Sequence, residues 1–366
     1  MRVLHIIARF NIGGTAAWIR ELTKNSSDFG IESLVATGRV GKSEVESQLL
    51  KELNYTYVKS LGNSVKPLRD LKAFWEIRNL IKSYDPDVIN THTAKAGLLG
   101  RLANLSLGEM RKPIVHTLHG HLLHGYFPKP IVRLVAMVER ILSSFTDLII
   151  FAGKNVQIDC LKVGIGKWDK SVVIYPGVSV AKLSKKSDRR PGSERVRIGW
   201  LGRVTQIKRP DRVLKIARKL PDVDFYIGGE GDLLKTCKDS APENTYFLGW
   251  SKPEEFWSQM DICLLTSDNE ALPISIIEAQ LYGLSTVATN VGSTSEVVID
   301  GENGYLTSVE IDEMVEKLTT LSGNSSLRDE MGKKAKARAK VVFSPQRQRD
   351  DHIAAYEMAI KSFEQK

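Results

Sequence analysis

Short apolar runs alternate with amphipathic stretches along the whole chain. β-branched and apolar runs between polar turns predict strands, and apolar residues at helical spacing, as in Leu68–Ser83, predict helices. Strands that alternate with helices are typical of parallel α/β sheets. In the first half the predicted strands are Val3–Ala8, Glu32–Thr37, Tyr57–Lys59, Val88–Thr91, Ile114–Leu118, Leu148–Phe151 and Val172–Tyr175.

A second series of the same kind follows a polar, turn-rich interruption at residues 181–194, which is typical of a linker. We therefore expect an N-terminal domain (1–180), a linker (181–194), a C-terminal domain (195–344) and a C-terminal helix (345–366) that packs back on the N-terminal domain. Two such sheets place a ligand cleft at the carboxyl ends of their strands. In the second half the predicted strands are Val196–Leu201, Asp224–Ile227, Tyr246–Leu248, Ile262–Thr266 and Ser285–Thr289, with helices at Asp211–Leu220 and Ile274–Tyr282.

Charge is distributed unevenly over the 366 residues. The 52 Lys and Arg residues and 43 Asp and Glu residues give a net charge of +9. Residues 1–190 hold 29 of the basic and 16 of the acidic side chains, a balance of +13, whereas residues 191–366 hold 23 and 27, a balance of −4. A basic half suits nucleic acid or an anionic membrane surface. We find no recognition-helix motif or basic–aromatic interleaving, so we expect no nucleic-acid partner.

The cysteine and hydropathy patterns bear on location. The three cysteines are widely spaced and form no CxxC pair, which favours a reducing cytosol over a disulfide framework. No apolar run approaches the ~18 residues that a membrane span needs. We therefore expect a cytoplasmic protein that lies, at most, on a membrane face.

Glycines and cations follow the first strand of each half. Gly13 and Gly14 stand between a strand and a helix, where they serve either as a tight turn or as backbone amides for a ligand. Arg203 and Lys208 follow the strand Val196–Leu201. Two cations at a strand end suit a diphosphate, and their position favours this function over the alternative, which is that they are ordinary cations of a solvated loop.

The segment 267–280 carries the strongest signal. It follows an apolar strand, and Pro273 stands where the first turn of a helix would begin, which predicts an anion site at the helix N-terminus. Glu270 precedes this helix, and Glu278 falls on its second turn among apolar neighbours. A carboxylate there needs hydrogen bonds, for example from ribose hydroxyls, unless it simply faces solvent.

These motifs, together with Gly301–Leu306, resemble glycosyltransferase family 4 over almost the whole chain. That family comprises retaining enzymes of GT-B fold, an α/β fold of two Rossmann-like domains that face each other across a cleft, and it uses nucleotide-diphosphate sugars. Residues 90–97 and 115–121 resemble a branch that builds bacterial surface polysaccharides on lipid carriers.

The resemblance implies a role for each motif residue. Arg203 and Lys208 would bind the diphosphate of the donor, and the backbone of Leu272, Pro273, Ile274, Gly13 and Gly14 would surround it. Glu278 would bind the ribose, and Gly229 and Leu248 would line the nucleoside pocket. Catalytic roles would fall to Glu270 and His119 at the transferred sugar and to Arg203 and Lys208 at the leaving group. Retention would proceed by front-face attack or through a covalent intermediate on Glu270, and the sequence leaves both open.

The partners implied are a nucleotide-sugar donor, with UDP-sugar favoured, and a lipid-linked or oligosaccharide acceptor at the inner face of the cytoplasmic membrane. His116, His119, His121 and His124 look like a metal cluster, but no Cys or carboxylate accompanies them, so we expect neither metal nor other cofactor. A nucleotide-sugar epimerase, which shares the two-domain architecture, is the alternative enzyme, and a nucleic-acid-binding protein is the alternative from another class.

Overall fold

The computed structural model describes residues 1–41, 45–62, 64–120, 129–179 and 195–365, so the predicted linker at 181–194 lies outside the described residues. The chain divides into two compact units. Unit 1 comprises Met1–Gly177 and Pro345–Lys366, and unit 2 comprises Val178–Ser344. By sequence, unit 1 carries 28 basic and 19 acidic side chains, whereas unit 2 carries 24 of each. The net charge of +9 therefore belongs to unit 1.

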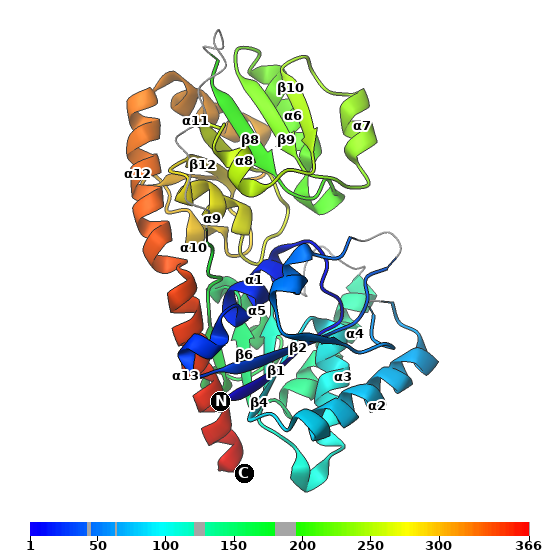
Figure 1. Cartoon of the computed structure of the whole chain (residues 1–366). Helices are drawn as coiled ribbons and strands as arrows, with labels where there is room; N and C mark the ends of the chain where they lie inside the picture. The colour runs from blue at the N-terminus through cyan, green and yellow to red at the C-terminus, as the bar shows by residue number, and fades with distance from the viewer. Residues whose placement is uncertain (42–44, 63, 121–128, 180–194, 366) are drawn as a thin grey trace. The chain divides into compact units, whose positions relative to one another are not determined.

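Unit 1 is built on a parallel sheet with the strand order β3-β2-β1-β4-β5-β6-β7 (Figure 1). The seven strands are β1 (Arg2–Ile7), β2 (Glu32–Thr37), β3 (Tyr55–Tyr57), β4 (Val88–His92), β5 (Ile114–Leu118), β6 (Leu148–Phe151) and β7 (Ser171–Val173). The predicted strands match these bounds to within two residues. The order reverses between β1 and β4, and ligands of such sheets bind at the carboxyl ends of the strands beside that reversal.

Helices flank the sheet of unit 1. They are α1 (Gly14–Thr23), α2 (Pro67–Tyr84), α3 (Ala94–Leu105), α4 (Lys129–Ser143), α5 (Lys154–Lys162) and α13 (Pro345–Glu364). Only some of the apolar residues at helical spacing in Leu68–Ser83, which predicted α2, are buried. Ala73, Ile77 and Ile81 are buried, whereas Leu71 and Trp75 are 57% and 51% exposed. Ala73, Ile77 and Ile81 join the core cluster of this sheet, whereas Leu71 and Trp75 lie outside that cluster.

The C-terminal helix α13 is an integral part of unit 1 (Figure 1). Its Tyr356 and Ala359 join a core cluster with Val3 of β1 and Val115 of β5. Polar contacts add to this packing, because Gln348 accepts a hydrogen bond from the Gly177 amide at 3.0 Å and donates to the Trp18 carbonyl at 3.2 Å. The last helix of the chain therefore completes the core of the first sheet.

Unit 2 repeats the design with six parallel strands in the order β10-β9-β8-β11-β12-β13. They are β8 (Arg197–Leu201), β9 (Asp224–Gly228), β10 (Thr245–Gly249), β11 (Ile262–Leu265), β12 (Ser285–Thr289) and β13 (Gly304–Thr307). The last strand was not predicted, because it is short and begins with glycine. Here the order reverses between β8 and β11, which places the loops after those two strands side by side.

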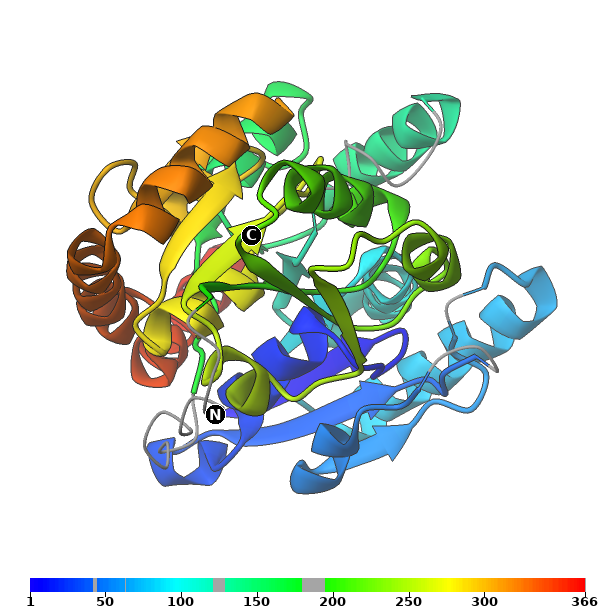
Figure 2. The same cartoon turned by 90° about the horizontal axis from the view of Figure 1, so that it is seen from above.

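Helices cover both faces of this second sheet (Figures 1 and 2). They are α6 (Pro210–Lys219), α7 (Leu234–Asp239), α8 (Pro253–Trp257), α9 (Ile274–Leu281), α10 (Thr294–Val297), α11 (Ile311–Gly323) and α12 (Ser325–Val342). Trp200, Phe225 and Leu318 lie in its apolar core. Within the described residues of both units, no helix is long and apolar enough to cross a membrane.

Candidate functional site

The loop after β8 turns Lys208 toward the end of β11. A single 3-10 turn (η5, Gln206–Lys208) precedes Arg209, whose backbone is left-handed with φ +53°, and Pro210 then begins α6. A left-handed non-glycine residue costs about 1–2 kcal/mol. Contacts offset this cost, because the Thr266 hydroxyl lies 3.0 Å from the carbonyl oxygens of both Lys208 and Arg209.

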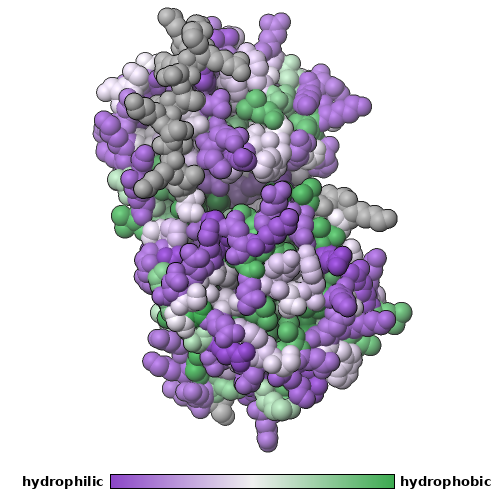
Figure 3. All heavy atoms as spheres, viewed as in Figure 1, coloured by the Kyte–Doolittle hydropathy of each residue, from purple (hydrophilic) through white to green (hydrophobic). Residues whose placement is uncertain are grey.

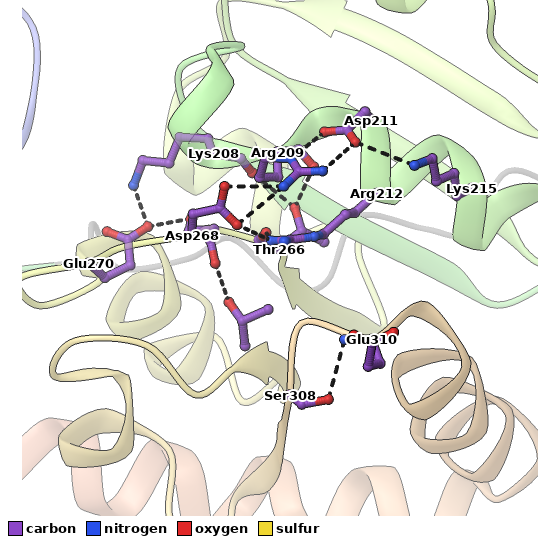
Figure 4. A network of polar contacts seen from close by, with 12 residues as sticks. Lys208, Arg209, Asp211, Arg212, Lys215, Thr266, Asp268, Glu270, Ser308 and Glu310 are labelled. Carbon is purple, nitrogen blue, oxygen red and sulfur yellow. Dashed lines mark hydrogen bonds and ion pairs between the residues drawn. The ribbon is translucent and has the colours of Figure 1, made fainter. Parts of the chain in front are cut away.

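A buried ion pair joins the two predicted site residues Lys208 and Glu270 (Figure 4). The Lys208 Nζ lies 2.5 Å from Oε1 of Glu270, and the Ser267 hydroxyl donates to the same oxygen at 2.6 Å. The Glu270 side chain is 8% exposed and that of Lys208 is 21% exposed. Because removing one partner leaves a largely buried charge uncompensated, this pair is expected to be sensitive to substitution.

A second set of ion pairs supports the same loops. Arg212 Nη1 lies 2.6 Å from Asp268 Oδ1, and Arg209 Nη1 lies 3.2 Å from Asp268 Oδ2. Arg209 also binds Asp211 through two contacts of 2.8 Å, and these hydrogen bonds lower the pKa of the Asp211 carboxyl. Figure 4 shows that Asp268 ties the β11 loop to the start of α6. The sequence analysis missed Arg209, Arg212 and Asp268, since nothing along the chain says that β8 and β11 are neighbours.

Gly292 holds the backbone of Glu270, and the sequence analysis missed this residue as well. It lies in the loop after β12 with φ +53°. A Cβ at this position would lie 1.7 Å from the Glu270 carbonyl oxygen, so only glycine fits. The next residue, Ser293, donates its amide to that same carbonyl at 3.3 Å.

The structure confirms the start of the predicted helix Ile274–Tyr282. Helix α9 begins at Ile274, and Pro273 precedes it as the N-cap. Proline carries no N–H, so it contributes no donor to an anion. The amides of Ile274 and Ser275 at the start of α9 have no intrahelical acceptor. They therefore replace Pro273 as backbone donors in the predicted anion site, and the neighbouring Leu272 is buried.

Glu278 lies on α9 against α8 and is half-buried. Burial raises the pKa of its carboxyl to about 8; the Trp257 indole opposes this increase and the nearby Glu254 carboxylate adds to it. The apolar neighbours predicted from the sequence, Ile276 and Ile277, are both buried. A carboxyl group in such apolar surroundings is suited to form hydrogen bonds with neutral hydroxyls.

The loops after β8, β9 and β10 come together at Gly229. Its φ is +127°, and a Cβ there would lie 1.9 Å from the Gly202 carbonyl oxygen. Its amide donates to the Gly249 carbonyl at 2.6 Å. Leu248, on the edge strand β10, is 46% exposed. Arg203 is exposed, and it forms no ion pair within the part of the chain that the structure describes.

In unit 1, the predicted residues lie at the carboxyl ends of β1 and β5. Gly13 is the N-cap of α1 and Gly14 its first residue. The Trp18 indole of α1 packs edge-on against the His119 ring, with centroids 4.9 Å apart. His119 directly follows β5, and its Nε2 lies 2.8 Å from Nδ1 of His92. Burial lowers the pKa of His119 to about 3, so this ring is neutral at ordinary pH.

The four histidines that look like a metal cluster along the sequence, and for which no metal was expected, are only partly covered by the described residues. His121 and His124 lie outside them. Nδ1 of His116 lies 2.8 Å from the Thr91 hydroxyl. This contact is separate from the one between His119 and His92. Among the described side chains, no three of the His, Cys, Asp and Glu residues are arranged to hold a metal ion.

Comparison with known proteins assigns the family. The sequence model of the family described as Glycosyltransferase Family 4 matches residues 12–182, and that of the family described as Glycosyl transferases group 1 matches residues 183–338. An uncharacterized 41.2 kDa protein in the cps region of Klebsiella pneumoniae is 28% identical over 324 residues, which cover 85% of this chain and 87% of that protein.

Two further proteins bear on activity and fold. The UDP-Gal:alpha-D-GlcNAc-diphosphoundecaprenol alpha-1,3-galactosyltransferase of Escherichia coli is 24% identical over 74% of this chain and 75% of its own. The crystal structure of Anabaena Alr3699/HepE in complex with UDP and glucose superposes with a TM-score of 0.82 at 20% identity, covering 98% of this chain and 99% of that one. Neither of these proteins favours the epimerase. Because the two family models together account for residues 12–338, this chain belongs to glycosyltransferase family 4, with a GT-B fold, and is a glycosyltransferase.

Proposed function

We propose that this glycosyltransferase moves a sugar, with retention of configuration, from a UDP-sugar to a lipid-linked or glycan acceptor during the synthesis of bacterial cell-surface polysaccharide. The main support for this proposal is the ion pair between Lys208 and Glu270. This pair lies where the strand order of unit 2 reverses, between β8 and β11, and the amides at the start of α9 follow Glu270 along the chain. The relatives add the class of substrate, since one is named for transfer from UDP-Gal to a diphosphoundecaprenol-linked sugar.

The leaving nucleotide diphosphate gains negative charge in the transition state. Lys208, the exposed Arg203 and the N-terminus of α9 are preorganised to stabilise that charge. When a diphosphate binds to Lys208, it takes over part of the pairing that Glu270 provides in its absence. The Glu270 carboxylate is then released to accept hydrogen bonds from the hydroxyls of the donor sugar.

The transfer step is a front-face displacement. The bond between the anomeric carbon and the phosphate oxygen breaks, and its electron pair leaves with the diphosphate. The acceptor oxygen bonds to the same face of the anomeric carbon, and its proton passes to the departing phosphate. Glu270 is a poor candidate for a covalent intermediate, because the Ser267 hydroxyl still binds its Oε1 after Lys208 has turned to the diphosphate. Proton NMR of the product tests retention through the configuration of the new linkage.

Nucleotide binding is tested by thermal shift with UDP, GDP, ADP and their sugars. A ligand that binds only the folded state raises the melting temperature, by an amount that grows with its concentration relative to Kd. We expect UDP and a UDP-sugar to raise it in the wild type. The Lys208→Ala variant should lose this response, and Lys215→Ala, which removes an exposed lysine of α6, should keep it. A response to GDP or ADP alone would overturn the choice of nucleotide.

We further propose that catalysis needs no metal, because Lys208, Arg203 and the α9 amides supply the positive charge that a divalent ion provides elsewhere. The test is the rate of sugar transfer after exhaustive treatment with EDTA. An unchanged rate is expected. A loss that Mg²⁺ or Mn²⁺ restores would contradict this part of the proposal.

We place the enzyme on the inner face of the cytoplasmic membrane, with α4 of unit 1 against the lipid. Exposed apolar residues follow one side of α4 and its continuation: Ile131, Leu134, Met137, Ile141 and Phe145, all between 45% and 56% exposed. The sole acidic residue of α4, Glu139, is buried against Arg101 with contacts of 2.7 and 2.9 Å, while Arg133 and Arg140 are exposed. An apolar side flanked by cations is typical of interfacial helices.

The positive charge of unit 1 supports the same placement. On the face shown in Figure 3, hydrophilic residues cover most of the surface and apolar residues form small groups among them. Helix α2 also exposes apolar residues, Leu68 and Leu71 among them, so it serves as the matched control. Liposome flotation is expected to show preference for anionic over neutral lipid. Met137→Glu should weaken that binding and Leu71→Glu should not, and the reverse result would move the contact to α2.

A further inference from the structure

Three histidines form a continuous hydrogen-bonded chain inside unit 1. Nδ1 of His5, in β1, lies 3.1 Å from Nε2 of His92, at the end of β4. Nδ1 of His92 lies 2.8 Å from Nε2 of His119, just beyond β5. The nearly parallel His5 and His92 rings have centroids 5.4 Å apart, and the His92 and His119 centroids are 5.0 Å apart. Rings at these separations with nitrogens in contact are joined edge to edge.

All three rings are neutral at ordinary pH. Burial lowers the pKa of His5 and of His119 to about 3, and it holds the pKa of His92 well below its usual range, with the neighbouring histidines adding to the effect. A neutral imidazole carries one N–H donor and one acceptor nitrogen. Each of the two contacts therefore needs an N–H from one ring and a lone pair from the next.

This requirement leaves two complete arrangements of the protons. In the first, all three rings carry the proton on Nε2, so His119 donates to His92 and His92 donates to His5. In the second, all three carry it on Nδ1, and both hydrogen bonds run the opposite way. A mixed set would place two lone pairs or two N–H groups against each other in the buried chain. The tautomer of any one ring therefore determines the tautomers of the others.

The free end of the chain is Nδ1 of His119. This atom is buried and has no hydrogen-bond partner, and the same is true of the indole nitrogen of Trp18, whose ring packs on His119. Unpartnered buried polar atoms are uncommon and call for an explanation. In the first arrangement Nδ1 of His119 accepts a hydrogen bond, and in the second it donates one.

We propose that His5, His92 and His119 act as one tautomeric unit, in which His5 and His92 are positioning residues that decide whether His119 offers a donor or an acceptor to a hydroxyl of the transferred sugar. This inference rests on the proposed function for the role of His119, but the coupling of the three rings is independent of it. His5 is a β1 residue two rings away from His119, and it touches no substrate in this scheme.

The test is ¹⁵N NMR of the full chain labelled at histidine, in which two-bond correlations to the ring protons report each tautomer. We expect His5, His92 and His119 to share one tautomer. His352 is an internal reference with the proton on Nδ1, because that atom lies 2.7 Å from the Gln348 carbonyl. A mixed set of tautomers among the three rings would overturn the proposal.

Three variants separate coupling from a purely structural effect. His5→Leu breaks the far end of the chain and should shift the ring nitrogens of His119, because hydrogen bonds in a chain polarise one another. His5→Asn keeps a partner for His92 and should preserve the His119 signals, which also leaves a testable variant if His5→Leu does not fold. His116→Asn changes a buried histidine outside the chain and should leave them unmoved. Unchanged His119 signals in folded His5→Leu, or equal shifts in His116→Asn, would contradict the coupling.

Activity gives a second readout. His5→Leu should lower kcat by about tenfold, the scale of one misdirected hydrogen bond, and His5→Asn should recover most of it. Equal losses in both variants would reduce His5 to a structural residue. A shared tautomer in a protein that turns over no nucleotide sugar would refute the proposed function and leave the coupling intact. Mixed tautomers in an active transferase would refute the coupling alone.

Discussion

The two units place their polar residues at equivalent points of similar sheets but use different chemistry. Where the strand order of unit 1 reverses, beside β1 and β4, the buried groups are neutral imidazoles joined nitrogen to nitrogen. Where unit 2 reverses, between β8 and β11, the groups are charged, with Lys208 on Glu270 and two arginines on Asp268. Neutral groups suit hydroxyls, whereas charged groups suit a diphosphate.

The net charge of the two units shows the opposite distribution. Unit 1, with the neutral network, carries the whole excess of +9, and unit 2, with the charged network, has equal numbers of acidic and basic residues. The charges at the reversal of unit 2 are thus balanced within ion pairs, while the unbalanced charge lies on the other unit. Net charge therefore indicates which surface attracts an anionic partner, but it does not locate the anion-binding site.

The largest effect is expected from breaking the charged network. In the proposed function Lys208→Ala removes a cation from the leaving group, and among the described residues it leaves the Glu270 carboxylate with the Ser267 hydroxyl as its hydrogen-bond partner. Loss of one preorganised electrostatic group typically lowers kcat by about 10²–10³-fold, which is the expectation here. Steady-state transfer kinetics measure it, with Lys215→Ala as the exposed control. Rates within twofold of that control would remove Lys208 from the site.

A large effect on stability is expected at the backbone of the same network. In Gly292→Ala the new Cβ would overlap the Glu270 carbonyl, so the loops after β11 and β12 must separate. Gly301→Ala is the matched control, because Gly301 also has a positive φ, +75°, but no atom within 4 Å of a Cβ. The control should lose about 1–2 kcal/mol from backbone strain alone, and Gly292→Ala clearly more. Urea unfolding compares the two, and equal losses would disprove the close packing.

An intermediate, pH-dependent effect is expected at Glu278. Its pKa is about 8 in the folded state and near 4.5 when unfolded. Between these values the folded state binds the extra proton, so the free energy of unfolding falls as pH rises. Glu278→Gln cannot ionise, so its melting temperature relative to wild type should increase from pH 4.5 to pH 8.5. Glu255→Gln, at an exposed carboxylate of α8, should show no such trend. A flat difference for Glu278→Gln would place that carboxyl in solvent.

The smallest effect is expected in unit 1, at a hydrogen bond that joins α13 to β4. The Tyr356 hydroxyl accepts a hydrogen bond from Nδ2 of Asn90 at 2.9 Å, and both groups are buried. Tyr356→Phe leaves that amide without its partner, which should lower the free energy of unfolding by about 1–2 kcal/mol. Tyr246→Phe, at a 42% exposed tyrosine of unit 2, should change it little. Equal values in denaturant titrations would mean that the Tyr356 hydrogen bond adds nothing to the docking of α13.

Much of the architecture was predictable because its signals are local. The alternation of apolar runs predicted the strands Glu32–Thr37, Ile114–Leu118, Leu148–Phe151 and Ser285–Thr289 with the bounds that the structure has. The strand β13 and the exposure of Leu71 and Trp75 on α2 escaped prediction. A short glycine-led strand lacks a pattern of its own, and the face of a helix that is covered depends on which neighbours pack against it.

The candidate site divides in the same way. Lys208 and Glu270 could be chosen from the sequence because each follows a predicted strand next to a helix start. Their contact could not, because 62 residues separate them and the order of β8 and β11 in the sheet is not written along the chain. Gly292 and Asp268 were missed for this reason, since their roles exist only through partners that are distant in sequence.

The sequence by itself therefore determined the family, the two α/β halves and most of the polar residues that matter, since periodicity, turn chemistry and motif order are local properties of the chain. Only the tertiary structure decided that β1, β4 and β5 lie side by side and thereby line up His5, His92 and His119. It also decided which side chains of α13, among them Tyr356 and Ala359, enter the core of unit 1. Both outcomes depend on the order of strands and the packing of distant segments, which arise from burial of the whole apolar surface at once.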